Sequence, residues 1–198
     1  MVNVVSIVEG DGEVKALPVL LRRLNERLSP EAHVRLLEPI KVHRMRFVNR
    51  DEEFARFLGL ASAKCGDDGW ILILLDADDD CPVGLGRSLL TKARAVLPHR
   101  RVSVVLANRE YEAWFIAASA SLNGQRGLVV SQDDAQAEAE RPRDAKGWLE
   151  KRMVSRHYSP TRDQPAFSAT MNLDEASARS RSFRKLCDEW MRQMNAHA

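Results

Sequence analysis

The residues best suited to chemistry lie in two short acidic segments. Glu9 and Glu13 are the first and last residues of the segment Glu-Gly-Asp-Gly-Glu. The second segment follows the apolar run Ile-Leu-Ile-Leu-Leu and contains Asp76, Asp78 and Asp80. Carboxylates crowded at one point repel one another, and burying them without a positive partner is very costly. Hard oxygen ligands of this kind suit Mg²⁺ or Mn²⁺, which also bind substrate phosphates. These residues therefore predict metal-assisted phosphoryl transfer or phosphodiester cleavage.

Both acidic segments follow predicted strands. Val2–Val8 is rich in β-branched residues, and Trp70–Leu75 is an unbroken apolar run, which is typical of a strand buried on both faces. If these strands are neighbours in a parallel sheet, their carboxyl ends bring the acids together at the edge where such sheets bind ligands. Gly10 and Gly12 predict a tight turn with positive φ after the first strand, and Asp11 is the expected N-cap of the next helix.

The rest of the chain alternates between helical and extended patterns. We expect further strands at Val34–Val42 and Arg101–Ala107 and helices at Glu13–Leu28, Asp51–Ala63, Leu85–Leu97 and Asn108 to about Ser121. Pro39 interrupts one of these strands, which places it at a sheet edge. The order predicts an α/β fold with a mostly parallel, four-stranded sheet flanked by helices. Residues 1–122 would form this core and residues 123–198 a helical extension that packs on it within one structural domain.

Composition is that of an ordinary globular protein. The 198 residues are 44% hydrophobic and 29% charged, and no apolar run approaches the length of a membrane span. The N-terminus lacks the pattern of an export signal. The cysteines are three in number and widely spaced, which favours free thiols in a reducing cytoplasm. We therefore expect a cytoplasmic protein that does not contact a membrane.

Basic residues are unevenly distributed although the net charge is only +2. Residues 14–50 contain nine Lys or Arg against three Glu, and residues 179–192 are basic again. Such segregation can form a positive groove beside an acidic metal centre, and it also fits solvated helix faces. The candidates for binding nucleic acid are Arg44, Arg46, Arg50, Arg181 and Arg184.

A third acidic pair, Glu110 and Glu112, follows the predicted strand at Arg101–Ala107. Glu112 could complete a second metal position, but acids after Asn108 also make an ordinary helix start. Each acidic motif alone fits a turn or a capped loop. Two such motifs at strand ends in the expected order favour a functional site.

At this point the residues resemble a known family. The Glu-Gly-Asp-Gly-Glu and Leu-Leu-Asp-Ala-Asp motifs are similar to the Toprim domain of primases, topoisomerases and OLD-type nucleases. The segments Asp-Ala-Asp-Asp-Asp-Cys-Pro, Tyr-Glu-Ala-Trp-Phe and Ser-Arg-Ser-Phe-Arg-Lys follow in the order found in a Toprim-like family of small bacterial proteins, the domain of unknown function DUF4276. The resemblance spans nearly the whole chain.

The resemblance implies a Toprim-like, Mg²⁺- or Mn²⁺-dependent nuclease acting on DNA or RNA, with a role in defence against phages or mobile elements. In it Glu9 would be a general acid/base or metal ligand, Asp76 and Asp78 metal ligands, and Glu13 the second acid of the nuclease branch. Two alternatives remain open. One is a non-catalytic partner of an ATPase; the other is a receiver-like Mg²⁺-binding module, for which the strand ending at Ala107 lacks the expected hydroxyl.

Overall fold

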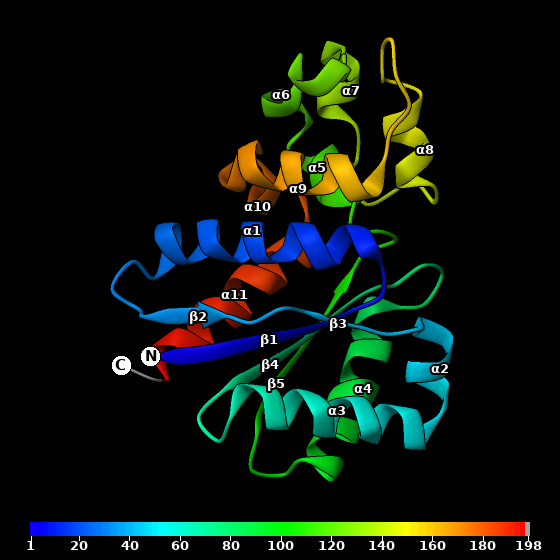
Figure 1. Cartoon of the computed structure of the whole chain (residues 1–198). Helices are drawn as coiled ribbons and strands as arrows, with labels where there is room; N and C mark the ends of the chain where they lie inside the picture. Colours follow the sequence, from blue (N-terminus) through cyan, green and yellow to red (C-terminus); the bar gives the residue numbers. More distant parts are fainter. Residues whose placement is uncertain (197–198) are drawn as a thin grey trace.

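The computed structural model describes residues 1–196 and shows a parallel sheet between two helical layers (Figure 1). The strands are ordered β2-β1-β4-β5, and β3 also pairs with β1. The strands are β1 (Val2–Val8), β2 (Val34–Leu36), β3 (Ile40–Lys41), β4 (Trp70–Asp76) and β5 (Arg101–Ala107). The prediction of an α/β fold with a parallel sheet is confirmed. Among the described residues, no helix is long and apolar enough to cross a lipid bilayer.

The predicted second strand is divided in two. β2 and β3 both run parallel to β1, with Val34 opposite Val2 and Ile40 opposite Ile7. Pro39 lies in the gap between them, where its missing N–H removes a hydrogen bond from the sheet. The sheet therefore has five strands by this division instead of the predicted four, and the proline lies at its edge as expected.

Each face of the sheet is covered by its own helices (Figure 1). One face packs against α2 (Arg44–Asn49), α3 (Asp51–Cys65) and α4 (Pro82–Val96), and the other against α1 (Asp11–Leu28) and α11 (Arg181–Asn195). The side chains of β4 alternate between these two cores: Trp70, Leu72 and Leu74 enter one, and Ile71, Ile73 and Leu75 the other. The unbroken apolar run thus follows from burial on both faces.

A third group of short helices lies beyond α1 (Figure 1). They are α5 (Ala113–Ala117), α6 (Ser119–Leu122), η1 (Gln125–Gly127), α7 (Gln132–Gln136), α8 (Ala145–Glu150), α9 (Pro160–Thr170) and α10 (Leu173–Arg179). Of these, α9 packs along α1 on the side away from the sheet. Phe167 of α9 and Leu17 of α1 belong to one hydrophobic core, so the two parts of the chain are joined by packing.

Two local predictions differ from the structure. The helix expected to begin at Asn108 begins at Ala113, and residues 108–112 form a loop that carries Glu110 and Glu112. The second difference lies in the C-terminal extension, where the sequence of α9 contains two prolines and few apolar residues and so carries no helical pattern of its own. Pro160 occupies the first turn of α9, where an N–H has no helical partner.

Candidate functional site

The two acidic segments meet at one edge of the sheet. β1 and β4 are parallel neighbours, with Val4 opposite Trp70 and Ile7 opposite Ile73, so their carboxyl ends coincide. Beyond these ends, Glu9 Oε1 accepts a hydrogen bond of 2.9 Å from the backbone N–H of Asp76. This hydrogen bond directly connects two residues, Glu9 and Asp76, that are 67 positions apart in the sequence.

The glycines of the first acidic segment serve close packing instead of an unusual backbone. Gly10 has a φ of −110° and occupies the N-cap position of α1, so the predicted positive φ is wrong. Asp11 is the first residue of α1 and not its N-cap. A Cβ on Gly10 would lie 2.2 Å from Glu13 Oε2, and one on Gly12 would lie 2.1 Å from Gln164 Oε1. Both glycines therefore leave room for side chains of the site.

Asp76 is the buried centre of the acidic edge. It ends β4, is only 7% exposed, and its Oδ1 accepts a hydrogen bond of 2.7 Å from the backbone N–H of Tyr111. Burial, reinforced by the negative charge of Glu9, raises the pKa of Asp76 well above its ordinary value, although Lys146 opposes this. Burial likewise raises the pKa of the half-buried Glu9.

Lys146 of α8 supplies positive charge to this edge. Its Nζ lies 3.1 Å from Glu110 Oε1, 3.5 Å from Glu112 Oε2 and 3.7 Å from Asp76 Oδ2. Burial alone would lower the pKa of Lys146, but the carboxylates raise it above its ordinary value. The ammonium group therefore stays charged and holds three acids from two strand ends together.

Gln164 of α9 connects two further acids. Its Nε2 donates hydrogen bonds of 2.9 Å both to Glu13 Oε1 and to Glu112 Oε1. Glu112 is fully buried and also accepts a hydrogen bond of 3.1 Å from the hydroxyl of Tyr158. Burial raises the pKa of Glu112, although Lys146 and Gln164 oppose this. The second oxygens of both glutamates have no hydrogen-bond partner among the described residues.

The outer acids of the second segment are held by Arg44. Its guanidinium, whose side chain is only 11% exposed, lies 2.7 Å from Asp80 Oδ2 and 3.4 Å from Asp78 Oδ2. It also donates hydrogen bonds to the backbone carbonyls of Asp76 and Ala77. Arg44, predicted to bind nucleic acid, thus fixes the acidic loop. Asp78 has a φ of 51° and its exposed side chain lines the site, whereas Asp80 does not.

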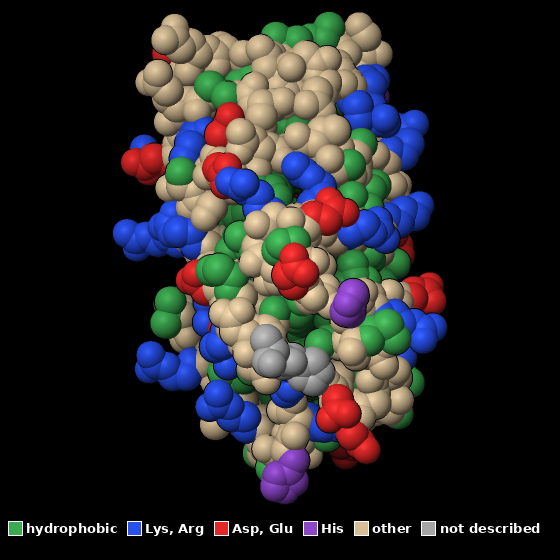
Figure 2. Space-filling model, turned by 90° about the vertical axis from the view of Figure 1, so that its left-hand side faces the viewer, with side chains coloured by type: hydrophobic (Ala, Val, Ile, Leu, Met, Phe, Trp, Pro, Cys, Tyr) green, Lys and Arg blue, Asp and Glu red, His purple; other side chains and the backbone are tan. Residues whose placement is uncertain are grey.

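The other basic candidates lie apart from the acidic edge. Arg46 and Arg50 are exposed, in and just after α2. Arg184 donates hydrogen bonds to the last carbonyls of α10, and Arg181 lines a different pocket, between α4 and α11. Lys and Arg side chains are scattered over the face shown in Figure 2 and form no continuous patch there. Arg46 and Arg50 thus lie one turn apart at α2, whereas Arg181 and Arg184 belong to α11.

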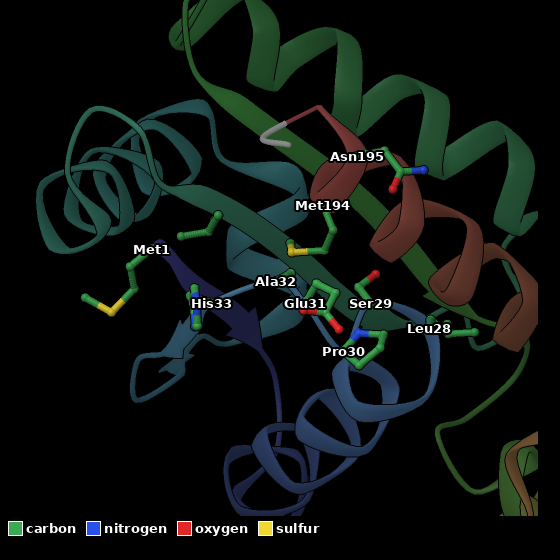
Figure 3. A pocket seen from close by; sticks show the side chains of 10 residues that line it. Met1, Leu28, Ser29, Pro30, Glu31, Ala32, His33, Met194 and Asn195 are labelled. Carbon is green, nitrogen blue, oxygen red and sulfur yellow. The ribbon is translucent and has the colours of Figure 1, made fainter.

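The acids line a pocket of about 400 Å³ at the N-terminus of α1. Its walls include Glu9, Glu13, Asp76, Asp78 and Lys146. Another pocket, of about 430 Å³, lies at the opposite end of α1, where Leu28, His33 and Met194 line it (Figure 3). An 18-residue helix is roughly 27 Å long, so this second pocket is remote from the acids.

The donor atoms of the acidic pocket fit a divalent cation by their chemistry. Within residues 1–196, no three or more His, Cys, Asp or Glu side chains are arranged so that they could coordinate a metal ion as they stand. Lys146 and Gln164 instead hold some of the carboxylate oxygens. Two buried glutamate oxygens, Glu13 Oε2 and Glu112 Oε2, accept no hydrogen bond, however, and the second has only the ammonium of Lys146 at 3.5 Å. Carboxylate oxygens of this kind are the hard ligands that Mg²⁺ and Mn²⁺ prefer.

Sequence reasoning missed the site residues that come from the C-terminal part. Lys146, Tyr158 and Gln164 all lie beyond residue 122, where the helical pattern is weak. Of these three residues, only Lys146 lies near a local sequence signal. Asp144 is a typical N-cap residue and caps α8, the helix that carries Lys146, by accepting a hydrogen bond from the N–H of Gly147. Gln164 has no such signal, since its role depends on the packing of α9 against α1.

Comparisons with known proteins bear on the family. No curated protein matches the chain. Among solved structures it is similar to the C-terminal region of the Xanthomonas campestris pv. campestris OLD protein, with 14% identity, a TM-score of 0.48, and 98% of this chain and 96% of that chain covered. At this identity and TM-score the likeness does not assign an activity. The family model described as "Domain of unknown function (DUF4276)" matches residues 8–190, which include both acidic segments, and the chain therefore belongs to this family.

Proposed function

We propose that this protein hydrolyses phosphodiester bonds of DNA or RNA at the acidic pocket, with Mg²⁺ or Mn²⁺ as cofactor. The observation that carries the proposal is an excess of acidic over basic side chains in a largely buried cluster. Glu9, Glu13 and Asp76 line the pocket, and Glu112 is joined to them through Lys146 and Gln164. Four acidic side chains thus face the single ammonium group of Lys146. Uncompensated buried carboxylates are costly, so this arrangement is maintained more readily if it serves to bind a cation.

Glu9, Glu13 and Asp76, which line the pocket, would hold the cation together with Glu112, which is buried behind the pocket wall. Asp78 also lines the pocket, and its side chain is exposed. When bound, a divalent cation supplies positive charge to a phosphate and lowers the pKa of a coordinated water. The second outer acid, Asp80, is paired with Arg44, and we assign it to the support of the loop.

The remaining groups would orient the substrate. The N–H of Tyr111 fixes the carboxylate of Asp76, and the N–H of Asp76 fixes one oxygen of Glu9. The other oxygen of Glu9 is left to act either as a ligand of the cation or as the base that takes a proton from water. The ammonium of Lys146 is placed to attract a phosphate oxygen at the pocket wall. Arg46 and Arg50 would contact more distant phosphates. An ATPase partner and a defence role remain predictions from the family resemblance.

A nuclease assay on the purified chain tests this proposal. Single- and double-stranded DNA and RNA are incubated with Mn²⁺, Mg²⁺ or EDTA. We expect cleavage that requires the metal and that falls at least about 100-fold in Glu9→Gln and Asp76→Asn, the usual size of a general acid/base contribution. Asp79→Asn is the matched control, because Asp79 belongs to the same loop but pairs with the exposed Arg143 outside the pocket. Undiminished cleavage in both pocket variants, or in EDTA, would refute the assignment.

A further inference from the structure

We propose that Gln164 is a positioning residue of the acidic pocket: its side-chain amide holds Glu13 and Glu112 as a pair, with one oxygen of each left for a cation. This inference rests on the proposed function and extends it to a residue outside the acidic motifs. Gln164 is fully buried, and its Nε2 lies 2.9 Å from Glu13 Oε1 and 2.9 Å from Glu112 Oε1.

The chemistry of the amide determines what the bridge can do. An amide nitrogen carries two N–H donors and accepts no hydrogen bond, so each glutamate must present an oxygen lone pair to it. The two carboxylates are thereby held close without any need for a proton between them. A glutamate or an apolar side chain at position 164 could not do this, because neither offers two donors.

A purely structural bridge would leave the glutamates satisfied, and this one does not. Glu13 Oε2 and Glu112 Oε2 are buried and have no hydrogen-bond partner among the described residues, although Lys146 Nζ lies 3.5 Å from the second of these. Leaving a buried polar atom unsatisfied costs about 1–3 kcal/mol, and such atoms are uncommon in native proteins. Gln164 Oε1 is likewise buried without a hydrogen-bond partner, so three neighbouring oxygens, two of them on carboxylates, are left for an outside cation to complete.

The surroundings of Gln164 hold its side chain in place. The adjacent Asp163 is fully buried and accepts hydrogen bonds from Arg126, Arg156 and the backbone N–H of Ser159, which fixes the first turn of α9. On the other side, Gly12 leaves the space that the amide fills, since a Cβ there would lie 2.1 Å from Gln164 Oε1. Residues that orient metal ligands in this way typically change metal affinity 10–100-fold when substituted.

Mn²⁺ binding to the full chain, measured by isothermal titration calorimetry, tests this role. We expect Gln164→Met, which keeps length and burial but removes both donors, to weaken Mn²⁺ binding about 10–100-fold. Gln193→Met is the matched control: Gln193 is also a buried glutamine, but it lies on α11, where its Nε2 donates to Ser103 and its Oε1 accepts from Arg101 instead of contacting the acids of the site. It should lose comparable thermal stability and keep its Mn²⁺ affinity within about twofold.

The outcomes separate this inference from the proposed function. If the wild type binds Mn²⁺ and Gln164→Met binds it equally well, the positioning role is wrong and the proposed function stands. If the wild type binds no Mn²⁺, both are wrong. Should Gln164→Met not fold, Gln164→Asn replaces it; its amide is one methylene shorter and cannot span both glutamates, so the same direction of loss is expected.

Discussion

Replacing Gly12 by alanine separates two opposing effects in the first turn of α1. A methyl group on this residue would lie 2.1 Å from Gln164 Oε1 and 2.6 Å from Gln164 Cδ. Both distances are far inside van der Waals contact, so the amide must move. Its movement weakens the bridge to Glu13 and Glu112, which has two hydrogen bonds of 2.9 Å. Alanine, on the other hand, is the better helix former.

The sizes of these two effects determine whether Gly12→Ala raises or lowers the free energy of unfolding. Alanine gains at most about 1 kcal/mol over glycine in a helix. Forcing an extra methyl group into a packed site costs about 1–3 kcal/mol, and each hydrogen bond to a charged group contributes about 1.5–3 kcal/mol. We therefore expect Gly12→Ala to destabilise the fold by about 1–4 kcal/mol, since the displaced amide keeps part of its hydrogen bonding to the two glutamates. For a chain of this length, each 1 kcal/mol lowers Tm by about 2–4 °C.

Gly59→Ala is the matched control, measured by urea denaturation and by thermal melting. Gly59 lies within α3, is exposed, and has nothing within 4 Å of an added Cβ. Only the helix preference acts there, so this variant should be more stable than the wild type by about 0.5–1 kcal/mol. If Gly12→Ala is also stabilised, Gln164 does not fill the space beside α1, and the bridge between the two glutamates is wrong.

Two further predictions concern side chains that support the site. Arg44→Ala removes the hydrogen bonds to the acidic loop and should lower the free energy of unfolding by about 1.5–3 kcal/mol. The substitution of the exposed Arg46 by alanine should change this free energy by less than about 0.5 kcal/mol. Equal effects of the two substitutions in urea denaturation would contradict the role of Arg44 in holding the loop. Burial works to raise the pKa of Asp163, but hydrogen bonds from Arg156, Arg126 and a backbone N–H leave that pKa below its ordinary value. The stability from this depressed pKa is present above the unfolded value of about 3.9 and is lost as pH falls through the folded pKa. Asp163→Asn should therefore lose about 1.5–3 kcal/mol at pH 7 and lose less relative to wild type in acid; a deficit that does not depend on pH would argue against the charge pairing.

The parts of the fold that sequence alone predicts are those in which a local pattern has one physical explanation. The apolar run of β4, Trp70–Leu75, has no polar face, so only a strand or helix buried all round accommodates it, and its short length favours the strand. Pro39 cannot donate to a sheet, which places its strand at an edge. In both places covalent structure and burial leave a single arrangement, and the structure has it.

The C-terminal helices show the opposite case. α9 contains two prolines and few apolar residues, so no local pattern indicates a helix there. Its stability comes from packing on α1, with Phe167 in the shared core, which is information that the segment itself does not contain. The positive φ predicted for the two glycines of the first acidic segment is wrong for the same reason, because the side chains that these glycines make room for lie one helical turn away or far along the chain.

The site repeats this division between local and distant information. The acids at the strand ends can be read from the sequence, because a strand must end where polar residues replace apolar ones. Their partners cannot, since Lys146 and Gln164 reach them from segments separated by 70 residues or more from Asp76 and Glu13, respectively. The partners nevertheless decide the electrostatics: the ammonium group balances part of the charge, and the amide balances none of it while holding two acids close. A cluster of acids kept together by a neutral bridge contains more carboxyl groups than cationic groups, and the two glutamate oxygens that the bridge does not use are what makes the pocket suited to a cation.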